Sequence, residues 1–227
     1  AIVHYRALAG KDRTLSNGDI LLLDSGGHYQ TGTTDITRTL LIGNAPADAN
    51  VAGAFTNVLR GHIALAIAFF ESGATGQQLD GIARAPLWAA GLQFAHGTGH
   101  GVGVHLCVHE GPQRLSRMSE VALEPGMIVS NEPGYYREGA FGIRIENLLV
   151  VTEAETLPGG DMAAKLCFET LNFVPIDRRL IRSDMLSAPE RSWIDAYHAT
   201  CRDNIGPRLS QTARLWLRDA TAPLPKG

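Results

Sequence analysis

The segment DILLLDSGGHYQTGTTDITRTLL, residues 19–41, predicts two strands that fold back on each other. Its first part, residues 19–24, is a short apolar run closed by a Ser-Gly-Gly triplet at 25–27, which is typical of a buried strand followed by a turn. Its second part, residues 33–41, is rich in alternating β-branched residues, so we expect it to be the partner strand. Together the two parts predict a β-hairpin.

Outward from this hairpin, helix and strand patterns alternate along the chain. Helical periodicity predicts helices over residues 46–71 and 76–90, the second with a bend at Pro86. Apolar runs predict strands over residues 127–132 and 143–151. The mixture predicts an α+β fold.

After about residue 180 the pattern is helical again, and the sequence SAPE at 187–190 is typical of a capping box. We therefore predict a main domain over residues 1–180 and a helical extension over 181–227 that packs on it. Four apolar residues of the extension fit either a dimer contact or helix packing, namely Trp193, Tyr197, Leu215 and Trp216.

The composition excludes several classes of protein. The 227 residues carry a formal net charge of -3 without a block of like charges, so we expect no nucleic-acid partner. The longest apolar stretch, residues 63–70, is too short to span a bilayer, so we expect no membrane partner. The three cysteines form no CxxC pair, which indicates free thiols and a cytoplasmic location. The chain opens on strand-like sequence without a signal peptide, so we expect further sequence upstream.

Four carboxylates stand at the ends of predicted strands or inside them: Asp24, Asp35, Glu132 and Glu146. Each one alone fits a capped turn or a satisfied ion pair. Together they are costly to bury, and Arg144 is the one obvious counter-charge nearby. Divalent cations would neutralise the set.

Residues 96–111, HGTGHGVGVHLCVHEG, are crowded with glycine and histidine. The glycines argue against a helix and for a backbone that lies close to a ligand. We expect one of these histidines to bind metal and others to contact the substrate, with His105 as the one most easily explained structurally. A carboxylate-rich site with one histidine favours Mn²⁺, Zn²⁺ or Co²⁺ over a thiolate zinc site.

Several motifs, taken in order, resemble the pita-bread metallopeptidases, and among them the X-prolyl aminopeptidases (aminopeptidase P) of the cytosolic three-domain type. The motifs are LLLDSGGHY (21–29), GTTDITRT (32–39), HGTGHGVG (96–103), VHEGP (108–112), LEPGMIVSNEPGYY (123–136), GIRIEN (142–147), FETLNFVPID (168–177) and YHATCRDNIG (197–206). The resemblance implies that the main domain is a catalytic domain with a pita-bread fold, in which helices cover a curved, mainly antiparallel sheet. It also implies that the N-terminal portion of this domain precedes residue 1.

Carried over position by position, the resemblance implies a dinuclear centre of two divalent ions, with Mn²⁺ as the expected metal and Zn²⁺ or Co²⁺ as alternatives. Its five metal ligands would be Asp24, Asp35, His100, Glu132 and Glu146, with Asp35 and Glu146 bridging the ions. Asp24 would bind one ion, and His100 with Glu132 the other. The assisting histidines would be His4, His96 and His109, and Arg144 would orient the aspartate ligands.

The implied reaction is hydrolysis of the N-terminal Xaa-Pro bond of a peptide. Glu132 would be the general base toward a water activated by the metals, and His109 would stabilise the oxyanion. His96 and His4 would position the substrate on the proline side. The resemblance also implies a homodimer in the full-length protein.

Two alternatives remain open at the level of sequence. A prolidase would use the same fold and metals on Xaa-Pro dipeptides, although the VHEGP motif and the C-terminal extension favour aminopeptidase P. A binding module of the same fold that has lost catalysis would normally lack some of the ligands, and here all five are present.

Overall fold

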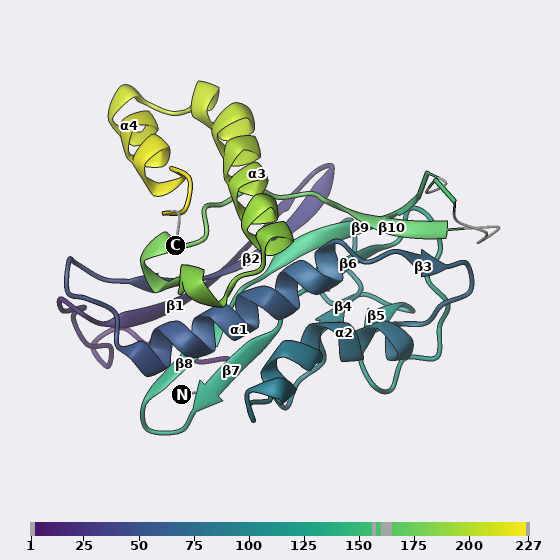
Figure 1. The fold of residues 1–227 in the computed structure, drawn as a ribbon, viewed down its shortest axis with the longest axis horizontal. Coiled ribbons are helices and arrows are strands. Elements are labelled where there is room, and N and C mark those ends of the chain that lie inside the picture. Colours follow the sequence, from purple (N-terminus) through teal and green to yellow (C-terminus); the bar gives the residue numbers. More distant parts are fainter. Residues whose placement is uncertain (1–2, 156–157, 160–164, 226–227) are drawn as a thin grey trace.

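The computed structural model describes residues 3–155, 158–159 and 165–225. The strands are β1 Ile20–Tyr29, β2 Gly32–Leu41, β3 Phe70–Glu71, β4 Gly99–His100, β5 Arg114–Leu115, β6 Ile128–Asn131, β7 Gly134–Arg137, β8 Phe141–Arg144, β9 Asn147–Glu153 and β10 Lys165–Thr170. The helices are α1 Ala49–Ala66, α2 Gly76–Ala89, α3 Ala188–Ile205 and α4 Gln211–Ala220, with short 3-10 turns at 178–180, 183–185 and 206–208. All the strand pairs are antiparallel (Figure 1).

The predicted hairpin is present as β1 and β2, but its turn lies at residues 30–31 rather than at 25–27. The predicted turn at the Ser-Gly-Gly triplet is wrong because β1 runs straight through it. A Cβ atom on Gly26 would stand 2.8 Å from the Thr34 carbonyl oxygen, so this glycine permits a close approach between strands. The register pairs Asp24 with Thr37 and Gly26 with Asp35, which places both aspartates on one face.

A four-stranded sheet in the order β3-β10-β9-β6 forms the second part of the frame. The predicted strand over 143–151 is interrupted, since β8 ends at Arg144 and β9 begins at Asn147. The Glu146 amide donates to the Thr37 carbonyl of β2, which draws the chain out of a regular ladder at this residue. The bend therefore brings Glu146 to the hairpin.

The first helix is shorter than its periodicity predicts. It begins at Ala49 because the Asp48 carboxylate caps it, accepting from the Asn50 and Val51 amides. It ends at Ala66, and the predicted helical residues 70–71 form β3, which pairs with β10.

The other predicted helices are confirmed. Helix α2 has the predicted bounds to within a residue and contains Pro86. The capping box is present between Ser187 and Glu190 at the start of α3.

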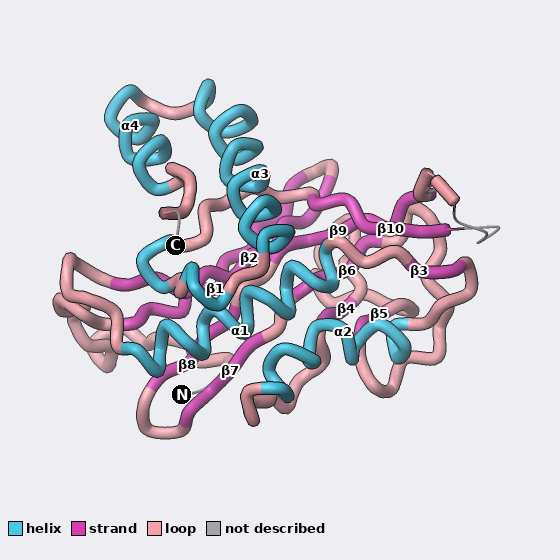
Figure 2. The backbone as a smooth tube through the Cα atoms, viewed as in Figure 1, coloured by secondary structure: helices cyan, strands magenta, loops and turns pink. Residues whose placement is uncertain are grey.

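Helix α1 lies between two apolar clusters and contributes to both. In the first cluster, Phe55, Leu59 and Ile63 of α1 pack with Ile143 and Ile145 and with side chains of α3. The second cluster joins the end of α1 to α2, β6, β9 and β10. Figure 2 shows α1 running along the strands beside α2, while α3 rises from the opposite side of α1. The frame that carries the polar strand residues is thus packed from behind.

The four apolar residues of the C-terminal extension that fit either a dimer contact or helix packing fall into two groups. Tyr197 is buried and stacks on Trp193 at 5.2 Å, so this pair serves helix packing. Leu215 and Trp216 are 48% and 62% exposed, so a dimer contact remains a proposal for these two alone. Within the described residues, no helix combines the length and apolar character needed to cross a bilayer.

Two glycines of α1 give a matched test of this packing. Gly61 lies where α1 crosses α2, and a Cβ there would stand 2.1 Å from the Ala83 carbonyl oxygen, whereas Gly53 has open space. We expect Gly61→Ala to lower the free energy of unfolding by about 1–3 kcal/mol through overpacking. Gly53→Ala should raise it by up to about 1 kcal/mol through helix propensity. Urea denaturation measures both, and equal effects of the two variants would contradict the close crossing.

Candidate metal centre

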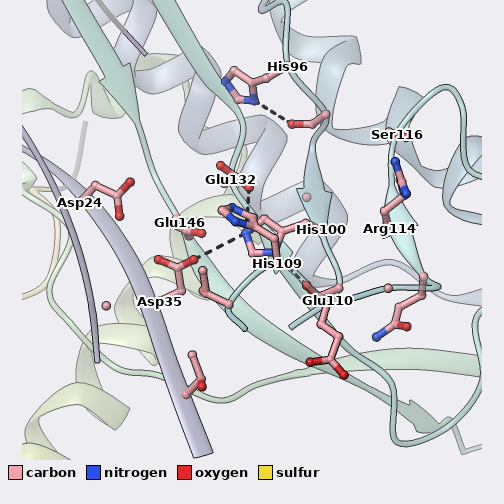
Figure 3. A pocket seen from close by; sticks show the side chains of 18 of the residues that line it. Asp24, Asp35, His96, His100, His109, Glu110, Arg114, Ser116, Glu132 and Glu146 are labelled. Carbon is pink, nitrogen blue, oxygen red and sulfur yellow. Dashed lines mark hydrogen bonds and ion pairs between the residues drawn. The ribbon is translucent and has the colours of Figure 1, made fainter. Parts of the chain in front are cut away.

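A cavity of about 800 Å³ opens between the hairpin, the Gly/His-rich segment and the strands that carry the glutamates. The sequence-predicted site residues all line it except Arg144, namely His4, Asp24, Asp35, His96, His100, His109, Glu132 and Glu146. Figure 3 shows that Asp35, Glu146, Glu132 and His100 point toward one another, with Asp24 on the hairpin side. His105 is exposed and does not line the cavity.

Three predicted ligands converge most closely. Asp35, His100 and Glu146 each offer a ligand atom, and these atoms lie within 4.8 Å of one another. The His100 Nε2 atom is 3.5 Å from Asp35 Oδ2 and 3.4 Å from Glu132 Oε1. Its Nδ1 faces the Gly101 carbonyl oxygen at 2.9 Å, which places the ring proton on Nδ1. When His100 is neutral, its Nε2 lone pair therefore faces the carboxylates, as a metal ligand requires.

Arg144 and Thr37 hold the carboxylates of Asp24 and Glu146. The Arg144 guanidinium donates to Asp24 Oδ2 at 2.6 Å and to the Thr37 hydroxyl at 3.1 Å. Thr37 in turn donates to Glu146 Oε2 at 2.6 Å. Arg144 thus orients Asp24 directly and Glu146 through Thr37. Thr37 has no role in the prediction from sequence.

Ser130 was also missed, and it ties a glutamate to the histidine segment. Its hydroxyl donates to Glu132 Oε1 at 3.0 Å and accepts from the His100 amide at 2.9 Å. The signal in the sequence was its position two residues before Glu132, on the same face of the strand predicted over residues 127–132.

The assisting histidines occupy different sides of the cavity. His96 donates from Nδ1 to the Gly97 carbonyl, and its Nε2 accepts from the Tyr136 hydroxyl at 3.0 Å. Burial lowers the pKa of His96 to about 4, so it is neutral at pH 7. The His109 ring lies 4.1 Å from the His100 ring, and His4 is exposed at the cavity.

The carboxylates repel one another inside this cavity. Burial, followed by the charges of neighbouring carboxylates, raises the pKa of Glu146 well above its ordinary value. Burial also raises the pKa of Glu132, although the charges of His100 and Arg144 oppose the shift. Burial lowers the pKa of His100, but its bond to Asp35 and the nearby glutamates outweigh this and raise it to about 9. Without metal, Glu146, Glu132 and His100 thus hold protons more tightly than usual. Their oxygen-rich donor set is one that fits divalent cations.

Two glycines of the histidine segment, residues 96–111, allow close contact with neighbouring backbone. A Cβ on Gly99 would stand 1.8 Å from the Ser130 carbonyl oxygen, and one on Gly101 would stand 2.1 Å from that of Glu110. The prediction of a non-helical, crowded segment is confirmed: these two glycines let the segment approach neighbouring backbone, and both line the cavity.

An ion pair on α2 fixes the same segment from below. Asp80 and Arg84 are buried, and Asp80 Oδ2 lies 2.6 Å from Arg84 Nε. Arg84 donates to the His96 carbonyl at 2.7 Å, and Asp80 accepts from the Thr98 hydroxyl at 2.7 Å. The Thr98 carbonyl then accepts the Glu132 amide at 2.8 Å. This arrangement sets the distance between the histidine segment and β6.

Comparison with protein families assigns nearly the whole chain. The sequence model of metallopeptidase family M24 matches residues 1–153, and that of the C-terminal region of the same family matches residues 165–224. The chain belongs to metallopeptidase family M24. The M24 C-terminal region includes β10, which pairs with β9, so a boundary at residue 180 stays a prediction.

Individual relatives agree with this family. The chain is 44% identical over 99% of its length to Aminopeptidase P1 of Lotus japonicus and 47% identical over 100% to Aminopeptidase P2 of Arabidopsis thaliana. It covers 34% and 32% of those two proteins, so it spans about a third of their length.

Solved structures confirm the pita-bread fold of this M24 chain. An X-prolyl aminopeptidase from Caenorhabditis elegans, described as a cytosolic enzyme with a di-nuclear active site, matches 97% of this chain with a TM-score of 0.89 and 38% identity, and the match covers 36% of that enzyme. The prolidase from Pyrococcus furiosus matches 61% of this chain with a TM-score of 0.56 and 33% identity, and the match covers 40% of that enzyme.

The raised pKa values predict how the metal-free M24 chain responds to pH. Between pH 6.5 and 8.5 the folded state keeps protons on Glu146 and His100 that the unfolded chain has released, so the free energy of unfolding should fall as pH rises. The buried neutral histidines, such as His96, change the pH dependence of the free energy of unfolding only below about pH 6.5. Urea denaturation in the presence of a chelator measures the slope.

Removal of one carboxylate provides the control for this slope. Glu146→Gln should flatten the loss of stability, because one of the groups that hold excess protons is gone. Saturating Mn²⁺ should flatten it as well, because metal displaces the protons. A metal-free protein whose stability rises over this window would contradict the mutual repulsion of the carboxylates.

Proposed function

We propose that the polypeptide containing this chain is a metal-dependent aminopeptidase that hydrolyses the N-terminal Xaa-Pro bond of peptides. The observation that carries the proposal is the meeting of four carboxylates and one imidazole at a single cavity, in a chain that resembles aminopeptidase P over its full length. The C. elegans relative, with its di-nuclear active site, supports a two-metal centre here.

The five side chains proposed to hold the metals are Asp24, Asp35, His100, Glu132 and Glu146. Divalent cations bound there would supply Lewis acidity and lower the pKa of water. Mn²⁺ is the metal that we expect, and Zn²⁺ or Co²⁺ would accept the same oxygen and imidazole donors. His100 reaches this role with its Nε2 already turned toward the carboxylates.

Glu132 is the proposed general base. Its carboxylate lies at the cavity, is fixed by Ser130 and has a raised pKa, all of which suit a group that takes and returns a proton near neutral pH. It would accept the proton of the attacking water and deliver it to the departing proline nitrogen. That nitrogen belongs to a tertiary amide without an N–H, so it must gain a proton in order to leave.

The histidines are proposed to contact the substrate. His109, whose ring lies next to that of His100, would donate to the oxyanion that develops on the carbonyl. His96 and His4 would position the peptide on the proline side, and the Arg144 bond to the Val3 carbonyl at 3.2 Å anchors the segment before His4. An apolar fit to the pyrrolidine ring would then supply selectivity, since the Xaa-Pro amide offers no donor.

Prolidase activity is the weaker proposal for this site. Aminopeptidase P1 of Lotus japonicus and the C. elegans enzyme match 99% and 97% of the chain, including its C-terminal helices, whereas the P. furiosus prolidase matches 61% of it. Loss of catalysis is weaker still, because every proposed ligand is present. We also propose a cytoplasmic location, and a homodimer of the full-length protein with Leu215 and Trp216 as its contact.

The base assignment is tested by Glu132→Gln. The amide keeps an oxygen for the metal but cannot take a proton, so turnover should fall by about 10²–10⁴-fold while metal content is retained. Glu120→Gln, at an exposed glutamate away from the cavity, is the matched control and should leave turnover unchanged. Steady-state kinetics with metal quantitation decides, and normal turnover in Glu132→Gln would rule out this base.

Substrate length separates the two peptidase proposals. The full-length polypeptide should release arginine from Arg-Pro-Pro far faster than it splits an Xaa-Pro dipeptide. Measurement of kcat/KM on both peptides at one metal concentration tests this. A clear preference for the dipeptide would identify a prolidase instead.

A further inference from the structure

Two asparagines lie directly behind the proposed metal centre. Asn131 precedes Glu132, Asn147 follows Glu146, and the two asparagines are paired across β6 and β9. Both are fully buried, with an exposed fraction of 0%. A shift of either asparagine would therefore move the adjacent glutamate.

His62 of α1 joins these two asparagines. Its Nδ1 lies 3.1 Å from the Asn131 carbonyl oxygen, which can only accept, so the ring proton is on Nδ1. Its Nε2 then accepts from the Asn147 side-chain amide at 3.4 Å, and its own carbonyl accepts from the Asn131 side chain at 2.9 Å. Burial lowers the pKa of His62 to about 3, which keeps this arrangement neutral. One helix residue thus contacts β6 and β9 at the residues adjacent to the two glutamates.

Arg38 of β2 binds the chain at residues 146–147, where it bends between β8 and β9. Its guanidinium donates to the Glu146 carbonyl at 2.6 Å and to the Asn147 side-chain oxygen at 2.7 Å. Arg38 is 4% exposed, and among the residues that the structure describes no carboxylate forms an ion pair with it. A buried charge satisfied by neutral oxygens alone is costly, and the hydrogen bonds of Arg38 tie Glu146 and Asn147 to β2.

Tyr197 connects this arrangement to the C-terminal helix α3. Its hydroxyl accepts from Arg38 at 2.8 Å and from the Val174 amide at 3.1 Å. Trp193, one turn earlier on α3, packs edge-on against the His62 ring at 5.9 Å. The C-terminal region therefore reaches the back of the metal centre through one hydroxyl and one ring.

We propose that His62, Arg38 and Tyr197 are positioning residues that set the spacing of Glu132 and Glu146 and thereby the affinity of the centre for metal. With Asn131 and Asn147 they form a rear network that touches neither metal nor substrate. The inference rests on the proposed function of the site. It gives the C-terminal region a part in metal binding that does not depend on a dimer contact.

The test measures Mn²⁺ binding to the metal-stripped full-length polypeptide by calorimetry, with thermal unfolding and steady-state kinetics alongside. His62→Leu removes both strand contacts and should raise the Mn²⁺ dissociation constant by about 10-fold or more, as loss of groups that orient metal ligands does. Tyr197→Phe removes one hydroxyl, keeps the ring and should raise it by about 3-fold. At saturating Mn²⁺ both variants should lower kcat more than they change KM.

A neighbour on α3 provides the matched control. His198 is also fully buried and accepts the Ile176 amide at 3.1 Å, so His198→Leu, like Tyr197→Phe, leaves one backbone N–H unpaired. The His198 ring lies 6.0 Å from that of Tyr197, but within the described residues its side chain forms no hydrogen bond to Asn131, Asn147 or the two glutamates. The variant should therefore lower thermal stability without weakening Mn²⁺ binding. If His62→Leu fails to fold, Tyr197→Phe against this control decides.

Two results would overturn the inference. One is Mn²⁺ binding by the folded His62 and Tyr197 variants that matches the parent, and the other is an equal loss of affinity in His198→Leu, which would reflect stability alone. Failure of the proposed function itself is recognised separately. In that case the unaltered parent binds no Mn²⁺ or cleaves no Xaa-Pro bond.

Discussion

The constraint on which the structure depends is the repulsion between carboxylates gathered at one half-buried cavity. Burial and neighbouring carboxylates both raise the pKa of Glu146, and burial raises the pKa of Glu132 against the opposing charges of His100 and Arg144. Arg144 pairs with Asp24, its guanidinium lies 3.8 Å from Glu132, and His100 is protonated at neutral pH, but these two cations do not balance four carboxylates. Metal-free, the protein responds by holding protons; a divalent pair would replace them and remove the repulsion.

Much of the remaining architecture resists that repulsion. The hairpin register aligns the two aspartates, and the break between β8 and β9 delivers Glu146 to them. The Asp80–Arg84 ion pair fixes the histidine segment from below, and the proposed rear network does the same for the glutamates from behind. These buried polar residues thus contact the segments that carry the proposed ligands, where small displacements would matter most.

The sequence predicted the elements that have strong periodicity and the residues whose chemistry is distinctive. It could not place the turn of the hairpin, because Gly26 looks the same whether it turns the chain or permits close strands. The interruption at Glu146 depends on the Thr37 carbonyl, a long-range contact with no local signal. Thr37 and Ser130 were missed because single hydroxyls are common on strands. His62 was missed because a lone histidine within a predicted helix gives no local signal that it is a fully buried hydrogen-bonding group.

The most direct test of the metal centre is an anomalous difference map from crystals of the full-length protein grown with Mn²⁺. The account predicts two peaks about 3.5–4 Å apart, as in other two-metal sites, held by Asp24, Asp35, His100, Glu132 and Glu146. Peaks elsewhere, or an active enzyme whose five side chains hold no ion, would contradict it.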